Sequence, residues 1–418
     1  MTAAVRGLSH IVLAVLAAVA AVLSVGCGGG SHESPGPRAA PLDASIARGT
    51  LLQATWSAYP RLVRLAHQSD ASRNGRIVAS VTENANGAWR AGFHVSGDDG
   101  ASFQRIGALA DPAFAAGLCC GTLFELPQAV GSIDAGTLLY AASVGADVAG
   151  GYMSHPIYGS DDGGGTFRRI DGATCGTSSL PRAPGAAGSG IWEPEFLVAA
   201  DGSLACIYSD ETEPGRSQVL KLTSTRDGVT WTAAQVIVAG PASSDRPGMA
   251  VVRRLPSGRY AMSFESCSAA ALDCAVRLKL SDDGLHWGAL GTLGTRPQTA
   301  AGQYFRHAPT LASTAAAGNS GGMLALIGQI VGADSAGVDV SATGRVLFVN
   351  DSGDGSGDWR MVTAPIALPS APQVTNWCQN YSTPLLPSTD GANVLLMQTD
   401  GTGDAGCTAR FGRGRLSP

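Results

Sequence analysis

The strongest fold signal in this chain is the segment Ser160-Asp161-Asp162-Gly163-Gly164-Gly165-Thr166-Phe167, because a close copy precedes it. The earlier copy is Ser96-Gly97-Asp98-Asp99-Gly100-Ala101-Ser102-Phe103. Asp and Gly at this spacing indicate a tight turn in which the Asp side chain accepts backbone N–H bonds and the aromatic ring packs beneath. We therefore expect the carboxylates of Asp98 and Asp162 to be structural, not catalytic.

Three looser copies follow the same pattern further along the chain. They are Ser224 to Trp231, Ser281 to Trp287 and Ser352 to Trp359. The aromatic positions of the five copies are 64, 64, 56 and 72 residues apart, a spacing that suits one four-stranded antiparallel sheet per copy. The pattern resembles the Asp-box, or BNR repeat, of sialidase-like β-propellers.

A second repeat predicts the inner strand of each sheet: a Pro followed by an apolar run, a turn and another apolar run. It occurs at Pro60, Pro194, Pro247, Pro309 and Pro384. Since Pro lacks an N–H donor, we expect it at the first residue of a strand. A sixth sheet is expected around 122–126 and 136–143, and a strand near 49–56 would complete the last sheet. The fold class predicted is all-β, a six-bladed β-propeller over residues 46–418.

Composition and charge exclude several classes of protein. The chain has 418 residues, 44% of them hydrophobic and 15% charged, with 56 Gly and 22 Pro, which disfavours helical bundles and coiled coils. Its net charge is -5 and basic residues form no block, so a nucleic-acid partner is not expected. Phosphate-binding, dinucleotide and nucleophile-elbow motifs are absent from the sequence, and we expect no cofactor.

The N-terminus is predicted to be an export signal. Arg6 precedes an apolar run over residues 11–25, and Cys27 follows it. The run resembles a bacterial lipoprotein signal peptide over 1–26, with lipidation at Cys27 and a flexible tether over 27–45. We expect a protein secreted across the bacterial inner membrane and lipid-anchored in the periplasm or on the cell surface. The alternative is an ordinary secretory signal in which Cys27 is incidental.

Eight further cysteines suit four disulfides in an oxidising compartment. Cys267 and Cys274 are close enough to close one hairpin, and Cys378 with Cys407 would tie the last segment together. Spacing leaves the pairing of the other four open. A zinc site is disfavoured because the sequence has no Cys-x-x-Cys or His-x-x-x-His spacing, so no metal is expected.

Polar residues beside the repeated Pro positions should converge on the central channel, because the first strand of each blade lines it. This set and the ends of the second strands comprise Tyr59, Arg61, Glu193, Arg246, Arg306, His307, Tyr381, Tyr208, Asp210, Glu211 and Glu265. Glu193 and Glu265 lie within apolar runs where a carboxylate is unfavourable unless function or a partner compensates. They form the candidate catalytic pair, with satisfied ion pairs to a neighbouring Arg as the alternative.

These segments resemble glycoside hydrolase family 93, the exo-1,5-α-L-arabinanases. The likeness covers about 59–386 and rests on Gly121 to Gly131, Ala135 to Leu139, Ile191 to Pro194, Tyr208 to Glu211, Arg246 to Met249 and Phe264 to Cys267. The resemblance implies a six-bladed propeller that releases short oligosaccharides from the ends of linear arabinan with retention, using two glutamates. It places these acids at Glu193 and Glu265. Glu195-Phe196 and the Ala/Gly-rich region 312–342 depart from the family's pattern.

Retaining chemistry requires one ionised carboxylate to attack and one protonated carboxyl to donate. Trp192 and Pro194 should desolvate Glu193 and raise its pKa, which favours Glu193 as acid/base and Glu265 as nucleophile. The other expected contacts with a polysaccharide or oligosaccharide substrate are Tyr59, Arg61, Trp192, Tyr208, Asp210, Arg246, His307 and Tyr381. We expect a monomeric enzyme.

Two other functions stay open from sequence. A sialidase would need three arginines and a Tyr nucleophile, for which Arg61, Arg246, Arg306 and Tyr381 are candidates. The other is a non-catalytic surface propeller that binds glycans or protein. In that case Glu193 and Glu265 would not face one another.

Overall fold

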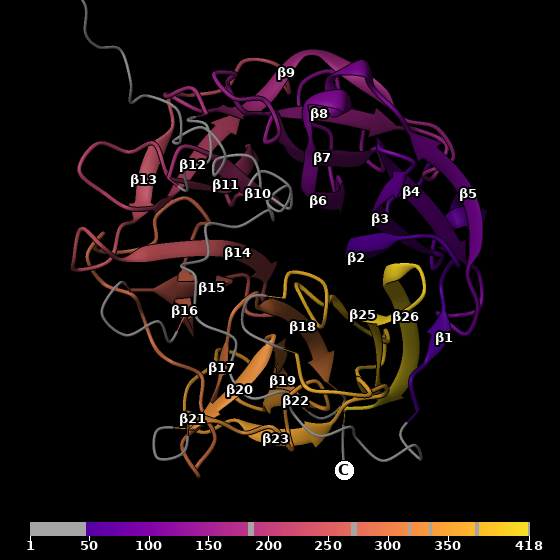
Figure 1. Cartoon of the computed structure of the whole chain (residues 1–418), viewed down its shortest axis with the longest axis vertical. Helices are drawn as coiled ribbons and strands as arrows, with labels where there is room; N and C mark the ends of the chain where they lie inside the picture. Colours follow the sequence, from indigo (N-terminus) through magenta and orange to yellow (C-terminus); the bar gives the residue numbers. More distant parts are fainter. Residues whose placement is uncertain are drawn as a thin grey trace, which may run out of the picture.

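The computed structural model describes residues 47–182, 188–268, 274–316, 319–333, 337–372 and 376–416. Over these residues the chain forms six antiparallel sheets, which are arranged as blades around one centre (Figure 1). Two short 3₁₀ helices, η1 (Ala71–Arg73) and η2 (Pro112–Ala116), lie between strands. The six-bladed β-propeller is therefore confirmed. The predicted signal peptide, Cys27 and the predicted tether lie outside the described residues.

Blades 1 to 3 each contain four strands in chain order. Blade 1 consists of β2 (Ser57–Arg64), β3 (Ile77–Ala85), β4 (Ala88–Ser96) and β5 (Gln104–Leu109). Blade 2 consists of β6 (Leu118–Glu125), β7 (Leu138–Val144), β8 (Ser154–Ser160) and β9 (Arg168–Thr177). Blade 3 consists of β10 (Ile191–Val198), β11 (Leu204–Asp210), β12 (Val219–Thr225) and β13 (Gln235–Val238).

Blades 4 and 5 share an insertion. Blade 4 starts with β14 (Arg246–Arg254), β15 (Tyr260–Cys267) and β16 (Ala275–Ser281), and blade 5 consists of β18 (Thr310–Ala316), β19 (Asn319–Ile327), β22 (Val346–Asn350) and β23 (Arg360–Thr363). The sheet of blade 4 continues through β17 (Gln303–Arg306), β20 (Ile330–Ala333) and β21 (Gly337–Val338). The region 312–342 that departs from the family pattern thus supplies β20 and β21, which extend the neighbouring blade.

The last blade is completed by both ends of the described chain. It contains β24 (Leu385–Pro387), β25 (Asn393–Gly403), β26 (Gly406–Arg415) and the N-terminal β1 (Thr50–Leu51). Thr50 pairs with Phe411 and Leu51 with Arg410. The predicted closing strand near 49–56 is confirmed, and its pairing removes a free sheet edge.

The repeated Ser/Asp/Gly segments connect the third strand of a blade to the segment that follows. Asp162 Oδ1 accepts the backbone N–H groups of Gly165 and Thr166 at 2.9 and 3.0 Å. Asp283, in one of the looser copies, accepts those of Leu285 and His286, both at 2.8 Å. Asp227 and Asp354 likewise accept backbone N–H groups, so the looser copies keep an Asp carboxylate as the acceptor of the turn.

The repeated Pro residues do not all occupy the predicted place. Pro60 and Pro194 are the fourth residues of β2 and β10, and they follow β-bulges at Tyr59 and Glu193. The expectation that each Pro begins a strand was wrong for these two blades. A bulge leaves a residue outside the ladder, so a missing N–H donor is tolerated there.

The eight described cysteines form four disulfides. Cys267 pairs with Cys274 and Cys378 with Cys407, as the spacing predicted. The four whose pairing was open form Cys119–Cys120 and Cys175–Cys206.

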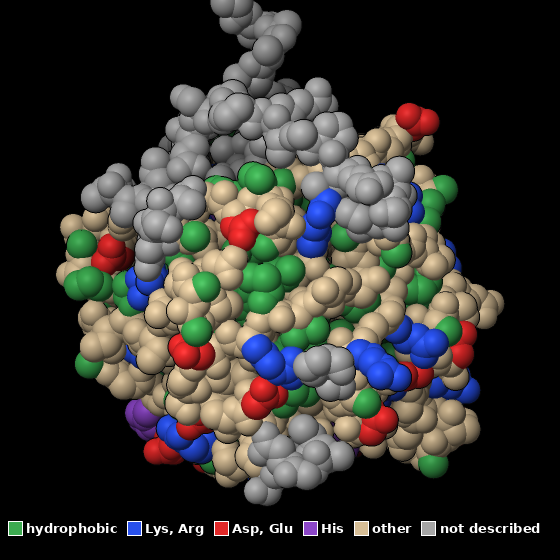
Figure 2. All heavy atoms as spheres, turned by 90° about the horizontal axis from the view of Figure 1, so that it is seen from below, with side chains coloured by type: hydrophobic (Ala, Val, Ile, Leu, Met, Phe, Trp, Pro, Cys, Tyr) green, Lys and Arg blue, Asp and Glu red, His purple; other side chains and the backbone are tan. Residues whose placement is uncertain are grey.

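The surface carries mixed charge. On the face shown in Figure 2, Lys and Arg side chains are interspersed with Asp and Glu, without a large area of one sign. Across the described residues there is no helix with the length and apolarity needed to span a membrane.

Candidate functional site

A β-bulge recurs at the same place in the inner strands of blades 1 to 4. One residue at each bulge has a positive φ angle. Tyr59, Cys120, Glu193 and Met249 have φ angles of 51°, 59°, 53° and 58°. The strand register shifts at each of them. Non-glycine residues seldom adopt this conformation, and strain of this kind concentrates at functional sites. Tyr59, Cys120 and Met249 belong to one buried cluster that also contains Trp192, the neighbour of Glu193.

Glu193 is buried and lacks an arginine partner among the described ion pairs. The Ser209 hydroxyl donates to its Oε2 at 2.7 Å, and the Ser209 oxygen accepts the backbone N–H of Met249 at 3.1 Å. Burial raises the pKa of Glu193 to about 8. The Ser209 hydrogen bond opposes that rise in pKa, whereas the negative charge of Glu265 adds to it.

Glu265 lies at the end of the second strand of the next blade. Its Oε2 accepts the backbone N–H of Ala308 at 2.7 Å, and the Nδ1 of His307 lies 3.8 Å from the same oxygen. Burial raises the pKa of Glu265 to about 7, while the Ala308 N–H and the positive charge of Arg246 act in the opposite direction. Both glutamates can therefore exchange protons near neutral pH.

Two tyrosines complete the surroundings of the glutamate pair. The rings of Tyr59 and Tyr381 have centroids 6.3 Å apart. Burial raises the pKa of Tyr381, and the charges of Glu265 and Glu193 raise it further. The pKa of Tyr59 is likewise raised by burial and by the charge of Glu193, although Arg61 opposes this effect. Residues from blades 1, 3, 4 and 6 thus meet in one site.

Arg246 and Trp192 are held by Glu211 at the edge of this site. Glu211 forms an ion pair with Arg246 Nη2, and its Oε2 accepts the indole N–H of Trp192 at 3.1 Å. Arg246 also donates to Gln218 Oε1 at 2.8 Å. The sequence left open an ion pair between Glu193 and a neighbouring Arg. In the structure, Glu211 forms the ion pair with Arg246 instead.

Arg61 lies under Tyr59. Its guanidinium is 4.2 Å from the centre of the Tyr59 ring, and Nη1 donates to the carbonyl oxygens of Pro60 and Ser382 at 2.8 and 3.2 Å. Arg61 therefore supports Tyr59 and joins blade 1 to the segment that enters blade 6.

Two predicted substrate contacts have structural partners in the protein interior. Tyr208 packs edge-on against His155, with ring centroids 5.2 Å apart. Asp210 is buried, pairs with Lys221 at 2.9 Å and accepts the Thr212 N–H. These contacts brace β11 and β12 beside the site.

Glu195, which departs from the family's pattern, links three blades. Its carboxylate accepts the Thr122 hydroxyl at 3.1 Å, the Val252 N–H at 3.2 Å and Arg253 Nη1 at 2.8 Å. Since blades 2, 3 and 4 meet at this carboxylate, the residue has a structural role.

His307 lies close to a disulfide. Cys267, Cys274 and His307 offer ligand atoms within 4.8 Å of one another. Both sulfur atoms belong to the Cys267–Cys274 disulfide, so neither is available as a thiolate ligand. Burial lowers the pKa of His307 to about 3, and its ring is neutral near pH 7.

Several residues of the site were missed by sequence analysis. Ser209 and the Ala308 N–H carry no recognisable signal, because their roles depend on strand pairing within blade 3 and on a contact with the next blade. The Cys119–Cys120 pair was visible as a Cys-Cys dipeptide, but spacing did not assign it. Trp56, Trp89 and Trp377 lie beside Tyr59 and Tyr381 in one pocket, although the chain separates them widely.

Solved structures with this fold include two enzymes in complex with arabinobiose. The α-L-arabinanase of Penicillium chrysogenum is 23% identical, covers 89% of this chain and 97% of its own, and has a TM-score of 0.70. The GH93 α-L-arabinofuranosidase of Fusarium graminearum is 20% identical, covers 89% and 98%, and has a TM-score of 0.71. The sialidase of Trypanosoma rangeli is 13% identical, covers 92% and 60%, and has a TM-score of 0.50.

No family model matches the chain, and its sequence matches no curated protein. The resemblance therefore rests on the motifs and on the shared architecture. This chain has the six-bladed propeller fold of the glycoside hydrolase family 93 arabinanases and arabinofuranosidases.

Proposed function

We propose that this protein is a retaining glycoside hydrolase that cleaves α-1,5-linked L-arabinan, or a related polysaccharide, from the chain end. The observation that carries the proposal is a pair of glutamates, Glu193 buried and Glu265 partly buried, without arginine partners among the described ion pairs. Each has a pKa raised toward neutrality, and each is close to Tyr381. Arabinobiose in two enzymes of the same fold favours an arabinan substrate.

Glu265 serves as nucleophile and Glu193 as acid/base. Glu265 attacks the anomeric carbon while Glu193 gives its proton to the departing glycosidic oxygen, and the carbon–oxygen bond of the linkage breaks. Glu193 then takes a proton from water, whose oxygen displaces Glu265 from the same carbon. This assignment requires a protonated Glu193 when Glu265 is ionised, and burial together with the charge of Glu265 favours that state.

The protein environment supports this division of roles. Glu265 is stabilised as an anion by the Ala308 N–H and the positive charge of Arg246. The pKa of Glu193 is raised by burial and by the negative charges of Glu265 and Glu211. When Glu265 is ionised, its charge therefore favours a protonated Glu193, the state in which attack can begin.

The sialidase alternative is weaker because two of the three arginines it needs are engaged by the protein. Arg61 binds two carbonyl oxygens beneath Tyr59, and Arg246 binds Glu211, Gln218 and Ser217. The non-catalytic alternative is disfavoured by the electrostatic coupling between Glu193 and Glu265.

The test is to assay purified protein on linear arabinan and on a sialyl reporter, and to follow the first product by proton NMR. We expect short arabino-oligosaccharides with retained anomeric configuration from arabinan, and no release from the sialyl reporter. An inverted product would remove the double displacement. Release from the sialyl reporter alone would support the sialidase.

We also propose that the chain is exported and anchored through a lipid on Cys27. The signal-like segment over 1–26 supports this, as do the four disulfides of the described residues, which favour an oxidising compartment. Mass spectrometry of the membrane fraction should find a diacylglyceryl group on Cys27. A soluble form cleaved elsewhere would support the secretory alternative.

A further inference from the structure

Tyr381, which lies close to both glutamates, occupies a strained turn. The turn comprises residues 379–382 and precedes the inner strand of blade 6. The two neighbours of Tyr381, Asn380 and Ser382, both have a φ angle of 54°. Non-glycine residues with such a φ angle cost free energy and persist only where the surrounding contacts hold them. The contacts that hold this turn therefore decide where the Tyr381 ring lies.

The side chain of Asn380 is buried, and its N–H groups and its oxygen are all engaged. Its Nδ2 donates to the carbonyl oxygens of Gly328 and Gln329 at 3.0 and 2.9 Å. Its Oδ1 accepts the Thr383 hydroxyl at 3.0 Å and Gln398 Nε2 at 2.9 Å. Gly328 and Gln329 follow β19 of blade 5, whereas Gln398 belongs to β25 of blade 6. One amide therefore ties the turn to two blades.

Gln329, which is fully buried, connects this turn to the surroundings of Glu265. Its backbone N–H donates to the carbonyl oxygen of His307 at 2.9 Å, and the ring of His307 lies beside Glu265. Its side-chain Nε2 donates to the carbonyl oxygens of Asn376 and Gln379, the latter at 3.0 Å. Gln329 thus joins the segment beside the proposed nucleophile to the segment that leads into the turn.

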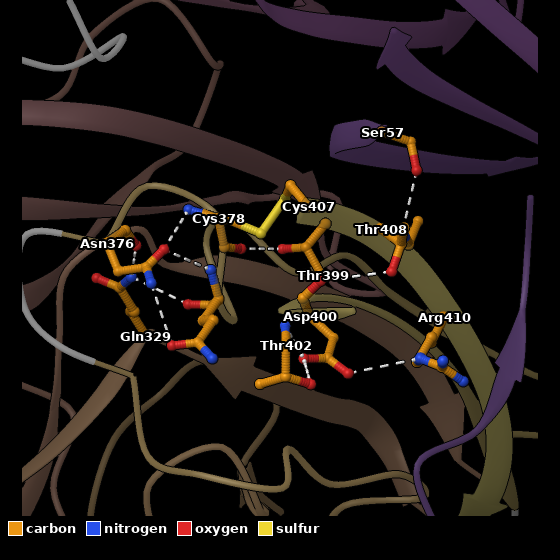
Figure 3. The surroundings of a disulfide bond; sticks show 12 residues. Ser57, Gln329, Asn376, Cys378, Thr399, Asp400, Thr402, Cys407, Thr408 and Arg410 are labelled. Carbon is orange, nitrogen blue, oxygen red and sulfur yellow. Dashed lines mark hydrogen bonds and ion pairs between the residues drawn. A yellow bond between two sulfur atoms is a disulfide. The ribbon is translucent and has the colours of Figure 1, made fainter. Parts of the chain in front are cut away.

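A disulfide between Cys378 and Cys407 of β26 holds the start of the turn (Figure 3). The carbonyl oxygen of Cys378 accepts the Thr399 hydroxyl and, at 3.2 Å, the backbone N–H of Tyr381. The backbone N–H of Asn380 donates to the carbonyl oxygen of Thr399 at 3.0 Å. The turn is therefore fixed by a covalent link to β26 and by hydrogen bonds to β25.

The ring that this turn positions packs against the residues around the glutamates. Tyr381 contacts the buried cluster that contains Trp192 and Ala308. Trp192 adjoins Glu193, and the Ala308 N–H donates to Glu265. Burial is the largest cause of the raised pKa of each glutamate. Because water beside the pair would lower both pKa values, the position of the ring affects both acids together.

We propose that Asn380 and Gln329 are positioning residues, which hold the turn so that the Tyr381 ring keeps water from the glutamate pair. The inference rests on the proposed function. Among the described hydrogen bonds, neither amide contacts Glu193 or Glu265, so both act through Tyr381. They make the working pH of the enzyme depend on contacts between blades 5 and 6.

Other titratable and charged groups also surround the pair, and substitution of Asn380 or Gln329 leaves each of them in the chain. They are Tyr59, Arg61, Glu211, Arg246, Arg306, His307 and Tyr381. A change in one of these charges would act most strongly on the glutamate nearest to it. Entry of water instead lowers the pKa of both glutamates, so both limbs of the pH profile should move in the same direction.

The test has two readouts. The first is the pH profile of kcat and kcat/KM on linear arabinan, measured per folded molecule. The second does not depend on turnover: the titrations of Glu193 and Glu265 are followed by carbon NMR of protein labelled at the glutamate carboxyl groups. Glu193→Gln and Glu265→Gln protein assign the two signals.

Two variants remove the amides, and a third is the matched control. Asn380→Gly removes the side chain but still allows the positive φ angle. Gln329→Met removes both side-chain donors at similar length. The control is Asn350→Gly, because Asn350 is also buried and its side chain hydrogen-bonds to Ser356, Gly355 and Ser352 of its own turn in blade 5.

We expect Asn380→Gly and Gln329→Met to lower kcat roughly tenfold, because a displaced ring disturbs the alignment of the reacting groups. Both limbs of the profile and both glutamate titrations should move to lower pH by about one pH unit. Asn350→Gly should lower stability to urea while leaving kcat and both limbs unchanged. Tyr381→Phe, which keeps the ring, should leave both limbs in place.

A double variant tests whether the amide acts through the ring. Tyr381→Ala should move both limbs as Asn380→Gly does, and combining the two substitutions should move them no further. If Asn380→Gly moves the limbs equally with and without the Tyr381 ring, the positioning role is wrong.

Two further results separate this inference from the proposed function. If folded Asn380→Gly or Gln329→Met protein keeps wild-type limbs and titrations, the positioning role is wrong and the proposed function stands. If wild-type protein cleaves no arabinan but both variants still lower the two titrations, the proposed function fails and the positioning role stands. Should Asn380→Gly protein not fold, Gln329→Met carries the same prediction.

Discussion

The hydroxyl of Ser209 donates a hydrogen bond to Glu193 Oε2 at 2.7 Å, from the strand that pairs with β10. This bond favours the ionised form of Glu193 and so lowers its pKa. We expect Ser209→Ala to raise the pKa of Glu193. The alkaline limb of the activity profile should then move to higher pH, because Glu193 stays protonated up to a higher pH. A pH profile of kcat/KM checks this. An unchanged or lowered alkaline limb would contradict the acid/base assignment of Glu193.

Glu193→Gln and Glu265→Gln should each lower kcat on linear arabinan by roughly 10³-fold or more, since an amide can neither ionise nor donate an acidic proton. Circular dichroism should show an intact fold. The control is Glu213→Gln, which alters a partly exposed ion pair with Lys221 and should leave kcat within about threefold. Ordinary activity in either site variant would exclude the catalytic pair.

The pH profile of wild-type kcat/KM should be bell-shaped around neutrality. The productive state has Glu265 ionised and Glu193 protonated, so activity rises as pH passes about 7 and falls as it passes about 8. These limbs belong to the coupled pair, since each charge shifts the other group. A profile that stays flat from pH 5 to 9 would contradict the mechanism.

Glu193→Gln should stabilise the fold more at pH 8 than at pH 5. The folded pKa of Glu193, about 8, lies above its ordinary value near 4.5, so the native state binds more protons than the unfolded state between these limits. The contribution of Glu193 to stability is therefore fully present below pH 4.5 and is lost as pH rises to about 8. Urea unfolding at both pH values measures the difference, and an equal effect at both would refute it.

Asp162→Asn tests whether the carboxylates of the repeated turns stabilise the fold without taking part in catalysis. Within its turn, the Asp162 carboxylate accepts hydrogen bonds from two backbone N–H groups and from the Thr166 hydroxyl. Because Asn weakens these hydrogen bonds, the free energy of unfolding should fall by about 1 kcal/mol. Activity per folded molecule should stay near the wild-type value. Loss of turnover in well-folded Asp162→Asn protein would show that the repeated carboxylates are not purely structural.

Local turn chemistry made the fold predictable from sequence. The contacts of Asp162 reach only three and four residues along the chain, so the pattern around Asp162 and Asp98 identifies each turn without knowledge of the rest. Counting these turns together with the Pro-led strands was enough to predict six blades and the closing strand. The bulges were not predicted, because a shift of register depends on the partner strand as well as on Tyr59-Pro60 or Glu193-Pro194.

The candidate acids could be named from sequence because a Glu inside an apolar run is unfavourable anywhere in a fold. Their surroundings could not be named. Glu193 is held by Ser209 of the adjacent strand, Glu265 by Ala308 of the next blade, and Trp377 lies beside Trp56 although they enter the fold from opposite ends of the described chain. Such contacts arise when strands pair within a blade and when the ring of blades brings distant segments together. Residue types and spacing along the chain therefore sufficed to predict the turns and the blades and to name the candidate acids. The pKa values of those candidates and the shape of the pocket beside them depend on how the strands and blades pack.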